Sequence, residues 1–316
     1  MPLGNHKIGN RQSAIGNALV ECVPNFSEGR KIEIVDRLAD AIDGVETACV
    51  LDTHIDPDHN RSVITFVAAP EMVVEAAVQA VGLAAELIDM RHHTGQHPRL
   101  GATDVLPFVP VRGVTLDDCV KLAHQAGERI AGELDIPVFF YERAALKPNR
   151  VNLEDVRRGA LELLREQIAN EPTRAPDVGP LNVHETAGAI AVGARSFLIA
   201  FNVNLRNSNL AIARQIARAV RARHGGLPFL KALGFELSTR GLVQVSMNLV
   251  NYGETGMHQA YDAVRREADK LGVEIVSTEI VGLVPENALD KDAEYFQKLE
   301  KFTENKILES RIRACK

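Results

Sequence analysis

The sequence predicts an α+β protein with two subdomains, each of which follows a ferredoxin-like β-α-β-β-α-β plan. Short valine-rich runs alternate with longer segments of helical periodicity, and this order of elements occurs twice along the chain. A proline-bearing stretch separates the two series. The 316 residues suffice for two domains of ordinary size, and 46% apolar with 25% charged residues permits a buried core in water.

The first series has strands where apolar and β-branched residues cluster, and helices where apolar residues recur at helical spacing. A polar bend divides its second and third strands, and a capping-box pattern begins its last helix. The first six elements make the ferredoxin-like plan. Strands are predicted at 18–23, twice within 46–69, at 104–111 and at 136–142, and helices at 31–42, 71–90 and 115–134.

The second series repeats this plan without convincing residue-level identity to the first. A charged helix at 152–170 and the prolines of 171–180 come before it, and they indicate a linker or crossing segment. Strands are predicted at 196–205, twice within 230–251 and at 273–285, and helices at 209–226 and 257–272.

These patterns divide the chain into four segments. The opening is polar and glycine-bearing, and it lacks the apolar core of a secretory signal, so we expect a disordered extension. The predicted segments are an N-terminal extension at 1–18, an N-terminal subdomain with its linker at 19–180, a C-terminal subdomain at 181–290 and a C-terminal helical tail at 291–316.

Charge and composition exclude several classes of protein. The net charge of −6 argues against a general nucleic-acid binder, which usually carries a basic face. Aromatic residues make up only 5% and tryptophan is absent, so stacking platforms for single strands are not expected. Because no apolar run reaches the roughly eighteen residues of a spanning helix, no membrane segment is expected either.

The cysteines predict where the protein resides. Cys22, Cys49, Cys119 and Cys315 are scattered along the chain and form no C-x-x-C pair. This spacing indicates a reducing compartment and buried or incidental thiols. We therefore expect a cytoplasmic protein.

The histidine-rich stretch RHHTGQHPRLGATD, residues 91–104, raises the question of a metal site. His93 and His97 have the spacing of H-E-x-x-H, in which a helix presents both imidazoles on one face. Gly95 lies between them and Pro98 follows directly, so helical geometry is disfavoured, and the glutamate base is missing. We therefore expect no metal at this stretch.

A catalytic loop explains the same stretch better. Pro98 biases His97 towards an extended backbone, and an imidazole with a reference pKa of about 6.5 can take and return a proton at neutral pH. Arg99 can hold an anionic group by a forked contact, and Asp104 can orient a histidine. A solvated polar loop without function is the alternative.

Two further segments are candidates for ligand contact. Residues 20–30 place Asn25, Ser27 and Glu28 directly after a buried strand, where ligands commonly bind, although a plain strand-to-helix turn explains them equally. Residues 179–195 are rich in small residues but lack the Lys-Ser/Thr pair of a phosphate loop. They predict either a ligand-covering loop or a plain linker.

Polar side chains also alternate with apolar ones in the strands at 201–205 and 243–251. This alternation directs their asparagine and serine side chains to one face of a sheet. A polar row on an otherwise buried face is hydrogen-bonded or lines a cavity. We favour a cavity wall, with hydrogen bonding between sheets as the alternative.

Several of these segments together resemble the formiminotransferase domain of glutamate formimidoyltransferases. The resemblance extends from about Leu19 to Leu289, and its most specific elements are VPNFSEG and HPR-x-GA. The sequence lacks the helical cyclodeaminase domain that bifunctional members carry after this point, so we expect a stand-alone transferase. The segments that carry the resemblance are LVECVPNFSEGR, RHHTGQHPRLGATDVLPFVPVRGVT, GARSFLIAFNVNL, LVQVSMNLVN and IVGLVPENAL.

The resemblance implies transfer of a formimidoyl group from N-formimidoyl-L-glutamate to N5 of tetrahydrofolate, in histidine degradation and one-carbon metabolism. It also implies two α/β sandwich subdomains with a ligand groove between them, a cytoplasmic homodimer, tetrahydrofolate as co-substrate and no metal. Two alternatives stay open. One is a related folate enzyme that acts on 5-formyltetrahydrofolate, and the other is a folate-binding module without catalysis.

The resemblance assigns the catalytic role to His97, as general base and then general acid. One imidazole can remove the proton that N5 loses on attack and return it to the departing glutamate nitrogen. Transfer is direct, so no covalent nucleophile is expected. His92 and His93 are left without a role.

The resemblance assigns folate contact to a ten-residue segment whose middle, NVHETA, departs from the animal members. Because both substrates carry carboxylates, we add Arg61 and Arg99 as anchors, with Asn25 as a further candidate. The folate-contact segment comprises Gly179, Pro180, Leu181, Asn182, Val183, His184, Glu185, Thr186, Ala187 and Gly188.

Overall fold

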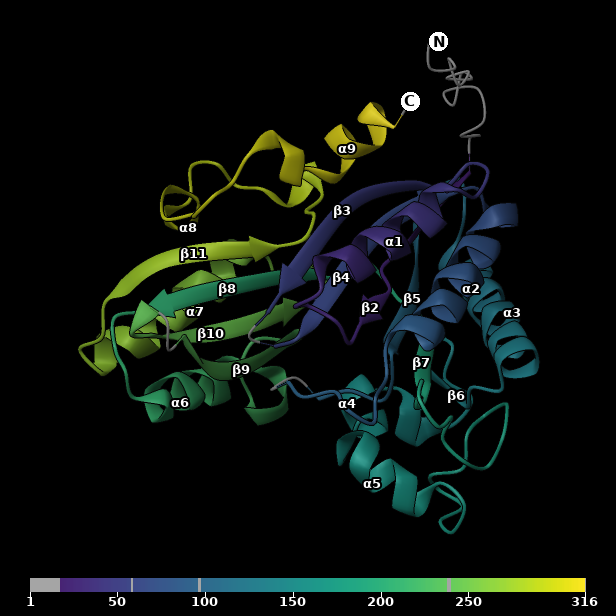
Figure 1. The fold of residues 1–316 in the computed structure, drawn as a ribbon. Helices are drawn as coiled ribbons and strands as arrows, with labels where there is room; N and C mark the ends of the chain where they lie inside the picture. Colours follow the sequence, from purple (N-terminus) through teal and green to yellow (C-terminus); the bar gives the residue numbers. More distant parts are fainter. Residues whose placement is uncertain (1–17, 58, 96–97, 238–239, 316) are drawn as a thin grey trace. The chain divides into compact units, whose positions relative to one another are not determined.

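A computed structural model describes most of the chain, namely residues 18–57, 59–95, 98–237 and 240–315. The described residues form two compact units (Figure 1). The first runs to Arg195 and takes in Ala314 and Cys315, and the second is Ser196–Arg313. Both units combine helices and strands, which confirms the predicted α+β class. The predicted extension at 1–18 lies almost wholly outside the described residues.

Seven strands form the sheet of the first unit. They are β1 (Leu19–Cys22), β2 (Asn25–Phe26), β3 (Cys49–Asp56), β4 (Arg61–Ala68), β5 (Thr103–Arg112), β6 (Val138–Glu142) and β7 (Ile190–Ala194). β1 and β2 are two halves of one interrupted strand, because each pairs with both β4 and β5. β3 pairs with β4 on one side, and β7 and β6 follow β5 in parallel on the other.

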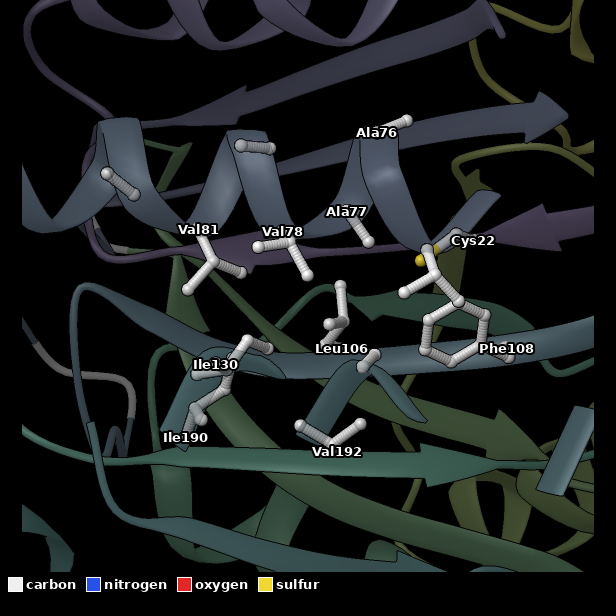
Figure 2. Packing of buried hydrophobic residues seen from close by; sticks show 14 of the residues in the cluster. Cys22, Ala76, Ala77, Val78, Val81, Leu106, Phe108, Ile130, Ile190 and Val192 are labelled. Carbon is white, nitrogen blue, oxygen red and sulfur yellow. The ribbon is translucent and has the colours of Figure 1, made fainter. Parts of the chain in front are cut away.

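Three long helices pack on this sheet, and their buried side chains form the main core of the unit (Figure 1). The helices are α1 (Ile32–Asp43), α2 (Pro70–Leu87) and α3 (Leu116–Leu134). Figure 2 shows Val78 and Val81 of α2 packed over Leu106 of β5, with Ile130 of α3 close to Ile190 of β7. α2 carries apolar residues on most of its surface and is largely buried, as its sequence predicted.

The order β1/β2-α1-β3-β4-α2-β5 confirms the predicted ferredoxin-like plan, since the first strand lies between the third and the fourth. β6 and β7 extend the sheet beyond this plan. The chain between them contains a 3-10 helix (Pro148–Arg150), α4 (Leu153–Val156) and α5 (Ala160–Gln167). The predicted charged helix and prolines therefore belong to the crossover that two parallel strands require.

The boundary between the units differs from the one expected at residue 181. Ile190–Ala194 form β7, which pairs in parallel with both β5 and β6. The chain thus completes the first sheet before the second unit begins at Ser196. The small residues of this strand, which suggested a loop, are all buried.

The second unit has four strands in the order β11-β8-β10-β9. They are β8 (Ile199–Leu205), β9 (Leu230–Leu237), β10 (Leu242–Leu249) and β11 (Ile275–Val281), with helices α6 (Leu210–Val220) and α7 (Met257–Lys270) and a 3-10 turn at Ala222–His224. The predicted plan is again confirmed, with the first strand between the third and the fourth. No described helix is both long and apolar enough to cross a membrane.

The C-terminal segment is only partly helical, although a helical tail was expected at 291–316. Short bridges to β11 and to the residue pair after it hold the segment, and Tyr295 is fully buried against Phe201. Its irregular course follows from these contacts. Its helical pieces are α8 (Glu294–Gln297), α9 (Leu308–Ala314) and 3-10 turns at Glu286–Ala288 and Glu304–Lys306.

The cysteines require a correction. Cys49, at the start of β3, forms a disulfide with Cys315, although 266 positions separate them in sequence. Only the fold brings the two Cα atoms to 6.2 Å, so scattered spacing could not reveal the pair. The expectation of incidental thiols at Cys49 and Cys315 is therefore wrong. Cys22 and Cys119 are buried thiols as predicted, and burial raises the pKa of Cys119 to about 12.

Candidate functional site

The loop that follows β2 is fixed against the histidine-rich stretch. Pro24 interrupts the strand because it has no backbone N–H to donate. Ser27 follows β2 directly, and its hydroxyl donates to the carbonyl of Gly101 over 2.7 Å. The Ser27 N–H donates to the carbonyl of Ala102 over 2.8 Å. Two of the candidate segments therefore lie side by side.

Asn60, in the turn between β3 and β4, holds three segments together. Its φ of 48° lies in the left-handed region, which asparagine tolerates better than most residues. Its Oδ1 accepts from the Gly29 N–H, and its Nδ2 donates to the Thr94 carbonyl, each over 3.0 Å. Gly95 lies so close to this turn that a Cβ at its position would collide with the carbonyl oxygen of His59.

His93 is held with both ring nitrogens engaged. Its Nε2 lies 3.1 Å from the Asn60 carbonyl, and its Nδ1 accepts from Arg99 Nε over 3.2 Å. Since a carbonyl only accepts, the hydrogen is on Nε2 and the ring is neutral. Burial lowers the pKa of His93, and the charge of Arg99 lowers it further. His93 therefore braces the loop, and binding a metal would break one of these bonds.

Arg99 makes a forked contact, as its sequence context suggested, but with a carboxylate of this chain. Its two terminal nitrogens donate to the carboxylate oxygens of Glu162, on α5, over 3.0 and 2.6 Å. The Arg99 side chain is only 14% exposed, whereas that of Glu162 is 64% exposed. A substrate carboxylate would therefore compete with Glu162 for the same guanidinium.

Asn25 and Arg61, two of the candidates, lie against each other. The Arg61 guanidinium donates to Asn25 Oδ1, while Asn25 Nδ2 donates to the Val23 carbonyl over 2.7 Å. Burial lowers the pKa of Arg61 to about 10, and the nearby charge of Arg157 adds to this effect, against Asp104. Arg61 is thus a partly buried cation that lies near one guanidinium and near the carboxylates of Asp104 and Asp56.

Asp104, which we considered as an orienting partner for a histidine, is bound to other groups. It forms a buried ion pair with Arg157, and its Oδ1 accepts from the Leu100 N–H over 3.0 Å. The carboxylate therefore closes the end of the histidine-rich stretch and connects it to the crossover that carries Arg157.

The second half of the folate-contact segment lies along the histidine-rich stretch. The N–H groups of Met90 and Ala102 donate to the carbonyls of Thr186 and Ala187, each over 2.8 Å. A Cβ on Gly101 would collide with the Ala187 carbonyl, so the two segments approach as closely as glycine allows. The first half of the segment reaches solvent, where Leu181 is 58% exposed.

The ring of His184 shapes this segment from within. Its Nδ1 accepts from the Ala187 N–H over 3.0 Å, and its backbone pairs with Gly188. Glu185 forms an ion pair with Arg91 over 2.8 Å, and Arg91 also pairs with Asp89. The histidine and glutamate of NVHETA are therefore engaged in holding the segment.

These contacts surround a small polar hollow with about 190 Å³ of empty space, part of which is open to solvent. It is lined by Phe26, Ser27, His59, Asn60, Arg61, His93, Arg99 and Asp104. Cationic, amide, hydroxyl and imidazole groups predominate in this lining, and one carboxylate is already paired. Such a set can hold a small anionic or amidine-bearing ligand through several hydrogen bonds.

His97, the predicted catalytic residue, lies outside the described residues together with Gln96. His92 is described, with its side chain 82% exposed and 4.0 Å from Asp89. Within the described part of the chain, no group of three or more His, Cys, Asp or Glu side chains could hold a metal ion.

Comparisons with known proteins match almost the whole described chain. The model of the formiminotransferase domain, N-terminal subdomain, matches residues 19–195, and that of the formiminotransferase domain matches 200–314. A glutamate formimidoyltransferase of Thermoplasma acidophilum is 50% identical over 297 residues, which cover 93% of this chain and 97% of that protein.

This chain belongs to the formiminotransferase family.

Two further members extend the comparison. A glutamate formimidoyltransferase of Streptococcus pyogenes serotype M1 is 44% identical over 93% of this chain and 98% of its own length. The formimidoyltransferase-cyclodeaminase of Rattus norvegicus is 43% identical over 90% of this chain, but over only 53% of its own length. The two formiminotransferase matches divide between residues 195 and 200, beside the structural boundary at Ser196.

Polar side chains of the second formiminotransferase unit hydrogen-bond to one another within its sheet. Gln244 donates to Asn204 Oδ1 over 2.9 Å, and Asn204 donates to the Ser277 hydroxyl over 3.0 Å. Asn202 donates to Glu279 over 3.2 Å. These bonds join neighbouring strands of one sheet, whereas we favoured a cavity wall and considered bonds between sheets.

Several residues of the site were not among the sequence candidates. Asp56 was considered only as a bend residue and His59 only as a further metal ligand that the fold would have to bring near. Arg157 and Glu162 were considered only as part of a charged helix. A D-x-x-H pattern in a tight turn can place an imidazole against a carboxylate, and this was the available signal. Nothing in the sequence indicated the partners of Arg157 and Glu162, which lie more than fifty positions away.

Proposed function

We propose that this formiminotransferase moves the formimidoyl group from N-formimidoyl-L-glutamate to N5 of tetrahydrofolate, releasing L-glutamate. The observation that carries the proposal is the near full-length identity to proteins named glutamate formimidoyltransferase. The geometry supports it, because two segments that resemble that domain in sequence, residues 20–30 and 91–104, meet around one polar hollow. The activity places the protein in histidine degradation and one-carbon metabolism.

The transfer reaction requires acid–base groups and no covalent nucleophile. N5 attacks the amidine carbon and must lose a proton, while the departing glutamate nitrogen must gain one. We assign this exchange to His97, which lies between the described residues Gly95 and Pro98. The Asn60–Thr94 bond and the neutral ring of His93 fix the chain just before it. Bracing of this kind keeps a catalytic group close to its productive position.

Anionic groups of both substrates require cations, and the hollow supplies two. Arg61 and Arg99 both line it, and Asn25 orients Arg61 through a hydrogen bond. We propose that these guanidinium groups hold substrate carboxylates. Residues 179–188 then contact the folate, and Leu181 and Asn182 are among its exposed residues.

A direct transfer assay tests the proposal. Purified protein is incubated with N-formimidoyl-L-glutamate and tetrahydrofolate, and both 5-formimidoyltetrahydrofolate and glutamate are measured. We expect stoichiometric formation of the two products. Turnover of 5-formyltetrahydrofolate in place of formimidoylglutamate would identify a related folate enzyme instead. Binding of tetrahydrofolate without any turnover would identify a folate-binding module.

The proposed reaction needs no metal, because proton transfer and charge anchoring suffice. Activity should therefore survive exhaustive chelation. Loss of activity that added zinc restores would overturn this part of the proposal and return attention to the histidines of 91–104.

We also propose a homodimer in the cytoplasm, as the resemblance implies. Light scattering at assay concentration tests the dimer, and a monomer would overturn it. The disulfide offers a test of location, because Cys49 and Cys315 should be thiols in a reducing compartment. Alkylation of the protein in freshly lysed cells should then label both residues, and their protection would contradict a cytoplasmic location.

A further inference from the structure

His59 lines the polar hollow, and one carboxylate fixes both its ring and its backbone. Its Nδ1 lies 2.7 Å from Asp56 Oδ2, and its N–H donates to Asp56 Oδ1 over 3.0 Å. The side chains of His59 and Asp56 are 24% and 34% exposed. The pair is therefore accessible from the hollow, yet restrained in orientation.

The pairing decides which ring nitrogen can exchange a proton. Burial raises the pKa of Asp56, but hydrogen bonds from the His59 ring and backbone outweigh it and lower this pKa to about 2. The carboxylate is thus ionised at neutral pH and can only accept, so Nδ1 carries a hydrogen. Nε2 is then the nitrogen that gains or loses a proton. The neighbouring negative charge favours the imidazolium form, which is an acid.

The other described imidazole of the hollow has a different environment. His93 donates from Nε2 to a carbonyl and accepts at Nδ1 from Arg99, so protonating it would break the bond from Arg99. Burial also lowers the pKa of His93. The two rings are thus complementary, because His93 is held neutral while His59 has a carboxylate that stabilises its charged form.

We propose that His59 is the general acid of formimidoyl transfer and that Asp56 is its positioning residue. This inference rests on the proposed function and divides the proton transfers between two imidazoles. His97 removes the proton from N5, and His59 supplies the proton to the departing nitrogen.

The transfer consists of an addition to the amidine carbon followed by departure of the glutamate nitrogen. The lone pair of N5 forms the bond to the amidine carbon, the π pair of the carbon–nitrogen double bond moves to the imino nitrogen, and His97 accepts the N5 proton. That nitrogen's pair then re-forms the double bond while the bond from carbon to the glutamate nitrogen breaks. The glutamate nitrogen keeps the bonding pair and takes the proton from His59 Nε2. Proton exchange with water restores both rings.

The experiment compares three variants with the wild type in the transfer assay. His59→Ala should lower kcat by ~10²-fold with KM nearly unchanged, within the usual contribution of acid–base catalysis. Added imidazole should restore at least tenfold of that loss, because it can occupy the vacated part of the hollow and supply the proton. His92→Ala, on an exposed side chain of the same loop, serves as the matched control and should leave kcat unchanged.

The Asp56→Asn variant tests whether Asp56 orients the His59 ring or only stabilises the turn. Its amide oxygen can still accept from the His59 N–H, so the turn is retained. Its amide nitrogen is a donor, so it would turn Nδ1 into an acceptor and remove the charge that favours the imidazolium. We expect a loss of kcat similar to that of His59→Ala and an unchanged melting temperature.

The outcomes are distinct. Near-normal kcat in His59→Ala, with an active wild type, overturns the acid role and leaves the proposed function intact. A loss that imidazole does not restore, together with a lowered melting temperature in both variants, assigns the pair to turn stability and also overturns it. A wild type without transfer activity means that the proposed function itself has failed.

Discussion

The two units share one fold plan but differ in the connection that leads to its fourth strand. In the first unit, this connection runs from Ile88 to Ala102 and its described residues form no helix or strand, while in the second it spans only Leu271–Glu274. Long irregular connections inside a compact domain are usually functional. The difference teaches that the plan supplies a scaffold, and that the long loop adds His93 and Arg99 to the lining of the hollow.

The polar side chains around Asn204 in the second unit also differ from those of the hollow in the first, because the former are neutral and the latter include cations. In the second unit, Asn204 is completely buried between Gln244 and Ser277, so neutral amides and a hydroxyl satisfy one another. In the first unit, the hollow contains Arg61 and Arg99, and Arg99 shares its guanidinium with the exposed carboxylate of Glu162. Buried amides bonded to one another stabilise a sheet, whereas a cation whose partner is exposed can exchange that partner for a ligand.

The largest effect should come from the long loop itself. His97→Ala should keep the fold and folate binding but lower transfer by roughly 10²–10⁴-fold, because the base for N5 is lost. Steady-state assays and tetrahydrofolate titration measure the two quantities. Near-normal turnover in this variant would end the catalytic role and weaken the contrast between the two connections.

A second contrast with the neutral buried amide of Asn204 is Glu21, a buried ionisable residue of the first unit. Glu21, on β1, is 1% exposed, and burial raises its pKa from 4.5 to about 7 against the opposing charge of Arg195. The folded state therefore keeps this proton where the unfolded state releases it. Its contribution to stability is full below pH 4.5 and is lost as the pH rises through about 7.

Glu21→Gln removes this titration. We expect the variant to be more stable than the wild type at pH 8 by roughly 1–3 kcal/mol, and to show a flatter stability curve from pH 4.5 to 7. Urea unfolding across this range measures both. Glu86→Gln, at an exposed position of α2, is the control and should follow the wild type. If the stability of Glu21→Gln and of the wild type depended equally on pH, the raised pKa of Glu21 would be contradicted.

The sequence predicted the fold better than the site's internal contacts. Periodicity depends on local neighbours, so the order of strands and helices followed from it in both units, but the strand at Ile190–Ala194 and the irregular course of the C-terminal segment were missed. The Cys49–Cys315 disulfide and the Arg99–Glu162 pair join distant positions, and nothing in their local sequence marks the partner. The resemblance pointed to residues 20–30 and 91–104, and only the fold shows Asn60 bonding to both of them.

Two asparagines test whether bracing in the first unit serves function. Asn60→Ala and Asn204→Ala each remove an amide that makes two hydrogen bonds, and each should cost about 1–3 kcal/mol of stability. Only Asn60→Ala should also lower kcat, since it releases Thr94 and the loop that follows. Thermal unfolding and transfer assays at a temperature where both variants are folded separate the effects. Equal loss of kcat in both would remove the functional contrast between the units.

The smallest effect is expected at the pair of Arg99 and Glu162. Because Glu162 is largely exposed, Glu162→Gln should change stability by less than about 1 kcal/mol. If Arg99 anchors a substrate carboxylate, this change removes a competitor, and KM for formimidoylglutamate should fall by up to about threefold. Arg99→Lys should raise the same KM, because an ammonium group cannot make the forked contact. An unchanged KM in both variants would make Arg99 a brace for His93 alone, and would leave Arg61 as the anchor of the hollow.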